Sequence, residues 1–319
     1  MVEKTVAFSI AENVRNEIGK VIVGMSEAVE SSLIALFTGG HIILEGVPGL
    51  AKTLFAKSFA MALGLNFKRI QFTSDILPSD IIGGLVFNRK TSELEFRPGP
   101  IFANIVLIDE INRAPPRSQS ALLEAMQERQ VTIEGVTHRL PEPFLVIATQ
   151  NPIELEGTFP LPEAEIDRFM MRVIIPYPAP SEEAEILRKK NLLGEQIPVN
   201  PVADAKSIME AVQEVRDVVV IPEILQYIVE IVSQTRRDSR LFVGASTRAE
   251  VALLYAAKAV AALRGRKYVI PDDVKHACFR VLNHRLMPKP EYKALSRTPE
   301  YGFVKQVIDE YLKTAAVPL

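Results

Sequence analysis

The 319-residue sequence has no tryptophan and a single cysteine, Cys278. One cysteine cannot form a disulfide within the chain, and it cannot build a cysteine-based zinc cluster. The four histidines show none of the spacings that are typical of metal ligands. Such sparing use of cysteine is typical of proteins of the reducing cytoplasm, where we expect this protein to work.

The sequence also lacks an excess of charge of one sign. Its 37 lysines and arginines nearly balance 39 aspartates and glutamates, which gives a net charge of −2. A strongly basic nucleic-acid binder is therefore disfavoured, and we expect no nucleic-acid partner, although a local basic patch is compatible with this balance.

The sequence also lacks long apolar runs. Residues 251–263 are rich in alanine, but the run is too short to cross a bilayer and Lys258 interrupts it. This pattern indicates a buried helix. The first residues show no basic stretch leading into an apolar run, so we expect neither export nor membrane insertion.

What is present is an ordinary globular composition, with 48% hydrophobic residues and a length typical of about two domains. Short apolar runs that alternate with helical patterns predict an α/β fold, a mostly parallel sheet with helices on both faces. The runs that we expect to form strands are 41–44, 70–72, 105–108, 144–148 and 172–175. The β-rich rhythm stops at the prolines of residues 176–180, so we predict domains of residues 1–178 and 179–319.

Local signals give further expectations for single elements. One helix is predicted to begin after Lys52 and to end at Gly64, and another to run from Ser118 to about Arg129; hairpins are predicted over residues 85–96 and 131–139. The second domain is expected to be nearly all helical. There Ser181 resembles a helix N-cap followed by Glu182 and Glu183, while Pro222 and Pro271 suit first helical positions.

The segment of residues 46–54 stands where a buried strand leads into a helix, the context of a phosphate-binding loop. Consecutive backbone N–H groups, a helix N-terminus and one mobile cation suit a polyphosphate. In this hypothesis Lys52 reaches the phosphates and the Thr53 hydroxyl binds Mg²⁺. The strict pattern has glycine where Ala51 stands, and a plain Gly-Pro turn before a helix remains the alternative. The full segment is Gly46, Val47, Pro48, Gly49, Leu50, Ala51, Lys52, Thr53 and Leu54.

A second candidate element is the strand that ends in Asp109 and Glu110. Ligands of open α/β sheets bind at the carboxyl edge, where this strand delivers two adjacent carboxylates. We expect Asp109 to hold Mg²⁺ and Glu110 to orient or deprotonate an attacking water. Many strands end in two acidic residues, so this feature alone is weak evidence for a function. Its position after the loop of residues 46–54 strengthens the functional interpretation.

Five motifs together resemble the MoxR family of AAA+ ATPases, a relative of magnesium chelatase and MCM motors. They are residues 46–53, 107–116, 148–152, 156–169 and 244–249, which span most of the chain. The resemblance implies a five-stranded parallel AAA+ core with a helical lid, with ATP and Mg²⁺ bound at residues 46–54. That family also carries alanine before the loop lysine. The two predicted hairpins resemble the helix-2 insertion and the pre-sensor-1 hairpin of this clade.

The resemblance also assigns residue roles. It implies that Asn151 is the sensor 1 residue, Arg168 an arginine finger for the neighbouring subunit, and Arg248 the sensor 2 residue. Val23 and Gly24 resemble the segment that lines the adenine pocket. Each residue also has a plain structural interpretation: Arg168 as a solvated partner of nearby acids, Asn151 as a turn residue and Arg248 as an exposed helix residue.

At the level of the whole protein, the resemblance implies a homo-oligomeric ring, with a hexamer as the expected form. It implies ATP hydrolysis that drives chaperone-like remodelling or maturation of a client protein, such as metal insertion. A von Willebrand factor A domain protein is the expected partner. The alternatives are a nucleotide-gated assembly scaffold and an MCM-like nucleic-acid motor.

Overall fold

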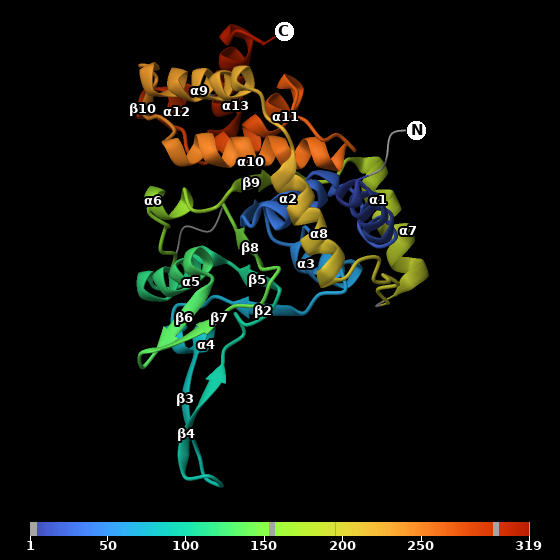
Figure 1. The fold of residues 1–319 in the computed structure, drawn as a ribbon, viewed down its shortest axis with the longest axis vertical. Coiled ribbons are helices and arrows are strands. Elements are labelled where there is room, and N and C mark those ends of the chain that lie inside the picture. Colours follow the sequence, from blue (N-terminus) through green and yellow to red (C-terminus); the bar gives the residue numbers. More distant parts are fainter. Residues whose placement is uncertain (1–4, 153–156, 195, 296–299, 319) are drawn as a thin grey trace.

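The computed structural model describes residues 5–152, 157–194, 196–295 and 300–318. Its centre is a five-stranded parallel sheet in the order β2-β5-β8-β1-β9 (Figure 1). All five predicted strands are confirmed, with ends shifted by at most three residues. The strands are β1 (Ile42–Glu45), β2 (Phe67–Gln71), β5 (Ile105–Asp109), β8 (Leu145–Gln150) and β9 (Met171–Ile174).

Helices cover both faces of this sheet, as the sequence predicts. Because side chains alternate along a strand, Ile42 and Leu44 join one apolar cluster and Ile43 joins the other. One face packs against α1 (Val6–Gly19), α2 (Ser26–Thr38) and α3 (Lys52–Ala62). The opposite face packs against α4 (Pro78–Ile82) and α5 (Pro116–Glu128).

Both predicted hairpins are present as separate two-stranded ribbons. They are formed by β3 (Gly83–Asn88) with β4 (Glu93–Pro98) and by β6 (Gln130–Ile133) with β7 (Val136–Arg139). The first ribbon projects away from the rest of the molecule (Figure 1). At its base the Phe96 ring stacks on His138 of the second ribbon, with ring centroids 3.9 Å apart.

The second half of the chain is mainly helical. Pro222 and Pro271 begin α9 and α11 as predicted, and the alanine-rich run lies in α10. Helix α8 lies against α1 and α2, and α10 packs on α2 and α11. The helices are α7 (Pro180–Leu193), α8 (Ala205–Asp217), α9 (Pro222–Arg237), α10 (Thr247–Leu263), α11 (Pro271–Leu282), α12 (Pro290–Leu295) and α13 (Glu300–Thr314).

The expectation of a nearly all-helical second domain is confirmed, with one short addition: β10 (Leu241–Val243) pairs with β11 (Met287–Pro288), and strands this short carry no readable periodicity. One expectation for this half was wrong. Ser181 is not the N-cap of α7. The helix begins one residue earlier, at Pro180, because the fixed φ of proline suits the first helical position, and Glu182 accepts a hydrogen bond from the Ala179 backbone N–H at 2.9 Å.

Two short elements complete the structure: η1 (Ile111–Arg113), which follows the carboxyl end of β5, and α6 (Glu163–Ile166), which precedes β9. Across the described ranges, the structure has no helix with the length and apolar character needed to cross a bilayer.

Candidate active site

The loop after β1 has the shape of a phosphate cradle. Gly49 has φ +85° and open space where a side chain would stand. Ala51 also adopts the left-handed conformation, with φ 53°, so alanine takes the backbone shape for which the strict pattern uses glycine. Helix α3 begins at Lys52, and its first backbone N–H groups face the loop.

The Lys52 ammonium folds back onto its own loop. Its Nζ donates hydrogen bonds to the carbonyl oxygens of Gly46 and Val47. Burial lowers the pKa of Lys52 from its usual value, and the nearby carboxylates of Asp109, Glu110 and Glu45 oppose this shift. The loop therefore holds its cation half-buried, within reach of anions that enter the loop.

Asp109 links the loop to the sheet. The Thr53 hydroxyl donates to its Oδ2 at 3.2 Å, and the Thr149 hydroxyl at the end of β8 donates to its Oδ1 at 2.8 Å. Thr149 Oγ1 also accepts a hydrogen bond from the Glu110 backbone N–H at 2.9 Å. These bonds fix the carboxyl ends of β5 and β8 against the start of α3. The hydroxyl of Thr53 and the carboxylate of Asp109 are the hard oxygen donors that Mg²⁺ prefers.

Glu110 follows β5 in a left-handed conformation, with φ 59° and ψ 58°. The side-chain amide of Gln71 donates to its Oε2 at 2.8 Å, and Arg113 Nη1 lies 3.1 Å from the same atom. A non-glycine residue in this region is strained, and such strain is concentrated at functional sites. Both contacts are made to Oε2, so Oε1 is the oxygen of Glu110 that can meet a water molecule.

The loop and the strand ends enclose a cavity of about 490 Å³. Asn151, 5% exposed, lines it directly after β8. An adjoining cavity of about 150 Å³ shares Gly49, Leu50, Ala51 and Leu54 with the first. Val23 and Gly24 line this second cavity together with the segment that enters α7. Among the predicted residues, the structure thus brings together Val23, Gly24, Pro48, Gly49, Leu50, Ala51, Lys52, Thr53, Leu54, Asp109, Glu110 and Asn151.

Comparisons with known proteins agree with this geometry. A family profile described as "ATPase family associated with various cellular activities (AAA)" matches residues 41–171, and one described as "AAA lid domain" matches residues 233–300. Chaperone MoxR1 of Mycobacterium tuberculosis is 42% identical over 95% of this chain and 81% of its own length. The chain belongs to the MoxR family of AAA+ ATPases.

Two further proteins show how far the similarity extends. YeaC of Bacillus subtilis is 47% identical over 86% of each chain. A crystal structure of a protein assigned as an ATPase, from Cytophaga hutchinsonii, superposes with a TM-score of 0.89 at 40% identity, covering 98% of this chain and 97% of that one. This MoxR-family chain therefore has the AAA+ core and lid that its motifs predict.

Arg168 and Arg248 do not line either part of the cavity at the loop of their own chain. Arg168 follows α6 and donates to the side chain of Gln127 at the end of α5. Arg248 pairs with Asp167 at 3.2 Å. Asp167 also pairs with Arg285 of the lid at 2.6 Å, and the Arg285 side chain is 2% exposed. Arg248 therefore pairs with the residue that directly precedes Arg168 in the sequence. Glu156, the first residue of the motif 156–169, lies outside the described residues.

Sequence reasoning missed Arg69, which lies at the same site. Its Nε donates to Asp109 Oδ2 at 2.9 Å, and its Nη2 lies 2.7 Å from that oxygen and donates to Gln71 at 2.6 Å. Arg69 and Gln71 stand two residues apart on β2. Their polarity near a strand end was the available signal, but only the pairing of β2 with β5 places them beside Asp109 and Glu110.

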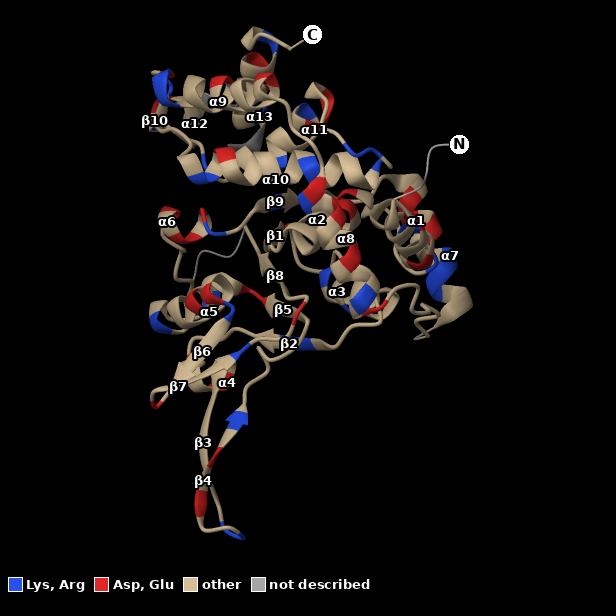
Figure 2. Cartoon of the chain, viewed as in Figure 1, with Lys and Arg blue, Asp and Glu red and all other residues tan. Residues whose placement is uncertain are grey.

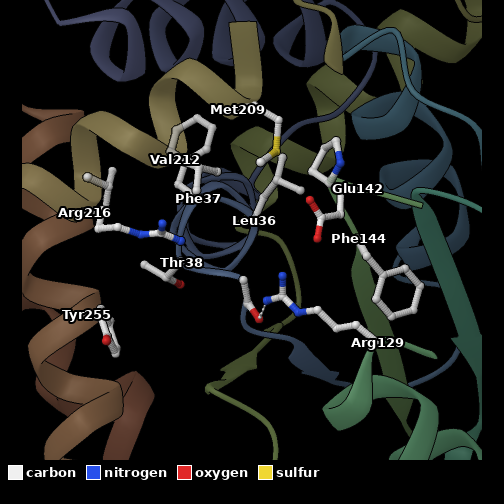
Figure 3. Close-up of a pocket in the computed structure, with 13 residues that line it drawn as sticks. Leu36, Phe37, Thr38, Arg129, Glu142, Phe144, Met209, Val212, Arg216 and Tyr255 are labelled. Atoms are coloured by element: carbon white, nitrogen blue, oxygen red, sulfur yellow. Dashed lines mark hydrogen bonds between the residues drawn. The ribbon is translucent and has the colours of Figure 1, made fainter. Parts of the chain in front are cut away.

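A separate cavity of about 220 Å³ lies between the end of α2, α8 and α10 (Figure 3). Arg129 after α5 lines it together with Glu142 and Phe144, which stand just before β8 begins, so it lies near the amino end of that strand and is distinct from the loop after β1. Basic and acidic residues are mixed over both halves of the chain (Figure 2).

Proposed function

We propose that this chain hydrolyses ATP to ADP and phosphate at the cavity between the loop and the strand ends. One observation supports this proposal most strongly: Lys52, Thr53, Asp109 and Glu110 line a single cavity. Backbone N–H groups of residues 49–53 and the Lys52 ammonium bind the phosphates, and Val23 and Gly24 border the base. Thr53 and Asp109 hold Mg²⁺, which neutralises charge on the phosphates when it is bound.

In this proposal Glu110 accepts a proton from the water that attacks the terminal phosphorus, and ADP leaves with the bridging oxygen. Asn151 positions that water from the end of β8. Catalysis is then mostly a matter of positioning and charge stabilisation by groups that are already fixed. Thr149 supports this arrangement, because its hydroxyl bonds both Asp109 and the Glu110 backbone.

We also propose that Arg168 and Arg248 complete the site of a neighbouring subunit. Their contacts with Gln127 and Asp167, away from the loop of their own chain, support this assignment. The assembly is then a ring of identical subunits, a hexamer, in which core residues 1–178 and lid residues 179–319 are the moving parts. A trans arginine contributes about 10³ to 10⁵ in rate in other NTPases.

The work done by the ring is proposed to be chaperone-like remodelling or maturation of a client protein, including metal insertion. The name of the relative chaperone MoxR1 supports this role. A von Willebrand factor A domain protein would present the client, and the complex would work in the cytoplasm. The mixed distribution of basic and acidic residues along the chain favours a protein client over the nucleic acid of an MCM-like motor (Figure 2).

Glu110→Gln tests the hydrolytic proposal. This variant should bind Mg-ATP with the affinity of the wild type while turnover falls by about a hundredfold or more, because the base is lost and the cradle stays intact. Calorimetry measures the binding, and phosphate release measures the turnover. Lys52→Ala is the matched variant, which should lose binding itself.

The same variant separates hydrolysis from a nucleotide-gated scaffold. If cells that carry Glu110→Gln keep the protein's function, ATP binding alone is sufficient and the remodelling proposal is wrong. Wild-type turnover by Glu110→Gln would contradict the role of the base.

A further inference from the structure

The smaller cavity next to the phosphate loop has one acidic group in an otherwise apolar lining. Its volume is about 150 Å³. Glu182, in the first turn of α7, is the one charged side chain among the described residues that line it. Its apolar neighbours include Val21, Val23, Leu50, Leu54, Ile175 and Ile186.

The Glu182 carboxylate lies beside Gly24, which lines the same cavity. A side-chain carbon placed on Gly24, which has φ +76°, would lie 3.2 Å from Glu182 Oε1 and 3.3 Å from Oε2. Gly24 therefore leaves room for the carboxylate at the segment that borders the base. Helix α7 fixes the side chain, because Oε2 accepts the Ala179 backbone N–H at 2.9 Å.

The two carboxylate oxygens of Glu182 differ in their hydrogen bonding. Oε2 caps α7, whereas no donor within the described ranges hydrogen-bonds Oε1. An ionised carboxylate can only accept hydrogen bonds, and a half-enclosed one is stabilised by a ligand that donates. On its pairing edge adenine offers the exocyclic 6-amino group as its donor, whereas guanine places an acceptor oxygen at that position.

We propose that Glu182 is the specificity-determining residue for the base, accepting a hydrogen bond at Oε1 from the 6-amino group of adenine. This inference rests on the proposed nucleotide site and adds the group that selects a 6-aminopurine. The apolar walls hold the ring, and Glu182 distinguishes the substituent at the 6-position.

Glu182→Gln is a sharp test because it keeps the helix cap. The carbonyl oxygen of glutamine can accept the Ala179 N–H, which turns its NH₂ group toward the base, where it meets another donor. Glu183→Gln is the matched control, since Glu183 lies in the same first turn but is exposed and does not line the cavity.

The measurement is calorimetric affinity of the full chain for Mg-ATP and for purine riboside triphosphate, which lacks only the 6-amino group. Wild type and Glu183→Gln should prefer ATP by about tenfold, as expected for a hydrogen bond to a charged acceptor. In Glu182→Gln the affinity for ATP should fall until it equals the affinity for purine riboside triphosphate. Equal melting temperatures of both variants would verify that α7 is intact.

Two outcomes would overturn the inference, and they differ from a failure of the proposed function. An unchanged preference for ATP in Glu182→Gln, or a wild-type preference for GTP over ATP, refutes the role of Glu182 while nucleotide binding stands. If wild type binds none of these triphosphates, the proposed function itself is wrong.

Discussion

Two residues at the site, Ala51 and Glu110, hold left-handed backbone conformations without being glycine. They stand where β1 passes into α3 and where β5 ends, the two points at which the chain must turn around the phosphate position. A left-handed L-residue costs about 1 to 2 kcal/mol. The fold thus keeps this strain at the site where the turns position the lysine and the carboxylates.

Ala51→Gly should relieve this strain. The gain of about 1 to 2 kcal/mol is partly offset by about 0.4 to 1 kcal/mol of unfolded-state entropy, so the free energy of unfolding should stay equal or rise by up to about 1.6 kcal/mol. Ala51→Val should lower it by about 1 to 2 kcal/mol, because a β-branched residue fits this region poorly. Urea denaturation measures both, and Ala205→Val, exposed at the start of α8, is the control. A clear destabilisation by Ala51→Gly would contradict this account.

Another residue-scale feature is the buried His41 at the start of β1. Its Nδ1 accepts the Val146 N–H at 3.0 Å, so Nε2 is the donor to the Met126 carbonyl at 3.2 Å. Burial lowers the pKa of His41 from 6.5 to about 4, and it also lowers that of His284. Protonation of His41 would break the bond from Val146, so the folded state keeps the neutral ring.

Because of this lowered pKa, we expect the free energy of unfolding to decrease as the pH decreases. Between pH 6.5 and 4 the unfolded chain binds protons that the folded chain does not, so the contribution of His41 is complete above pH 6.5 and is lost as pH falls. The free energy of unfolding should drop by about 2 kcal/mol from pH 7 to pH 5 on account of His41. Urea denaturation at both pH values measures this drop, and His41→Asn should reduce it. An identical drop in that variant would refute the assignment to His41.

At the scale of elements, the β3–β4 ribbon is held by its base. Phe96 packs edge-on against Phe102 and stacks on His138, while Phe87, 57% exposed, stands on the projecting part. Leu85, Val86 and Leu94 are also exposed there. The ribbon is therefore anchored through one aromatic residue, and its outer part contributes little to folding.

The matched pair Phe96→Ala and Phe87→Ala checks this anchoring. Phe96→Ala should lower the free energy of unfolding by about 1 to 2 kcal/mol through the lost ring contacts, and Phe87→Ala should change it by less than about 0.5 kcal/mol. Chemical denaturation measures both. Equal losses would mean that the outer ribbon packs against the molecule.

The strands themselves were predictable, because buried parallel strands appear in the sequence as short apolar runs. The start of α7 was not, because Ser181 and Pro180 both carry N-terminal signals and the choice depends on the reach of Glu182 to Ala179. The β10–β11 pair was equally hidden, since its two strands are short and far apart in the sequence.

At the scale of the whole molecule, Asp167 joins core and lid. Its carboxylate pairs with Arg248 and with the buried Arg285. Asp167 also directly precedes Arg168 in the sequence. If this face completes a neighbouring site, neither Lys52→Ala nor Arg168→Ala alone should hydrolyse ATP.

Mixing these two inactive variants should restore turnover. In an equal mixture about a quarter of the interfaces combine an intact loop with an intact arginine. Turnover should therefore recover to about a quarter of the wild-type value. Phosphate release on titrating one variant with the other measures it. A mixture that stays inactive although both variants assemble would show that Arg168 does not act between subunits.

The sequence by itself determined the loop, the two acids and the alternation of strands and helices, because each is written in consecutive residues with a fixed local geometry. Only the tertiary structure decided that Arg69 and Gln71 face Asp109 and Glu110, that Glu182 lines the smaller cavity next to the loop, and that Arg168 and Arg248 lie apart from their own loop. Those relations depend on the order of the strands in the sheet and on the packing of the lid. Both bring together residues that are far apart in the sequence, and nothing in the sequence indicates that these residues meet.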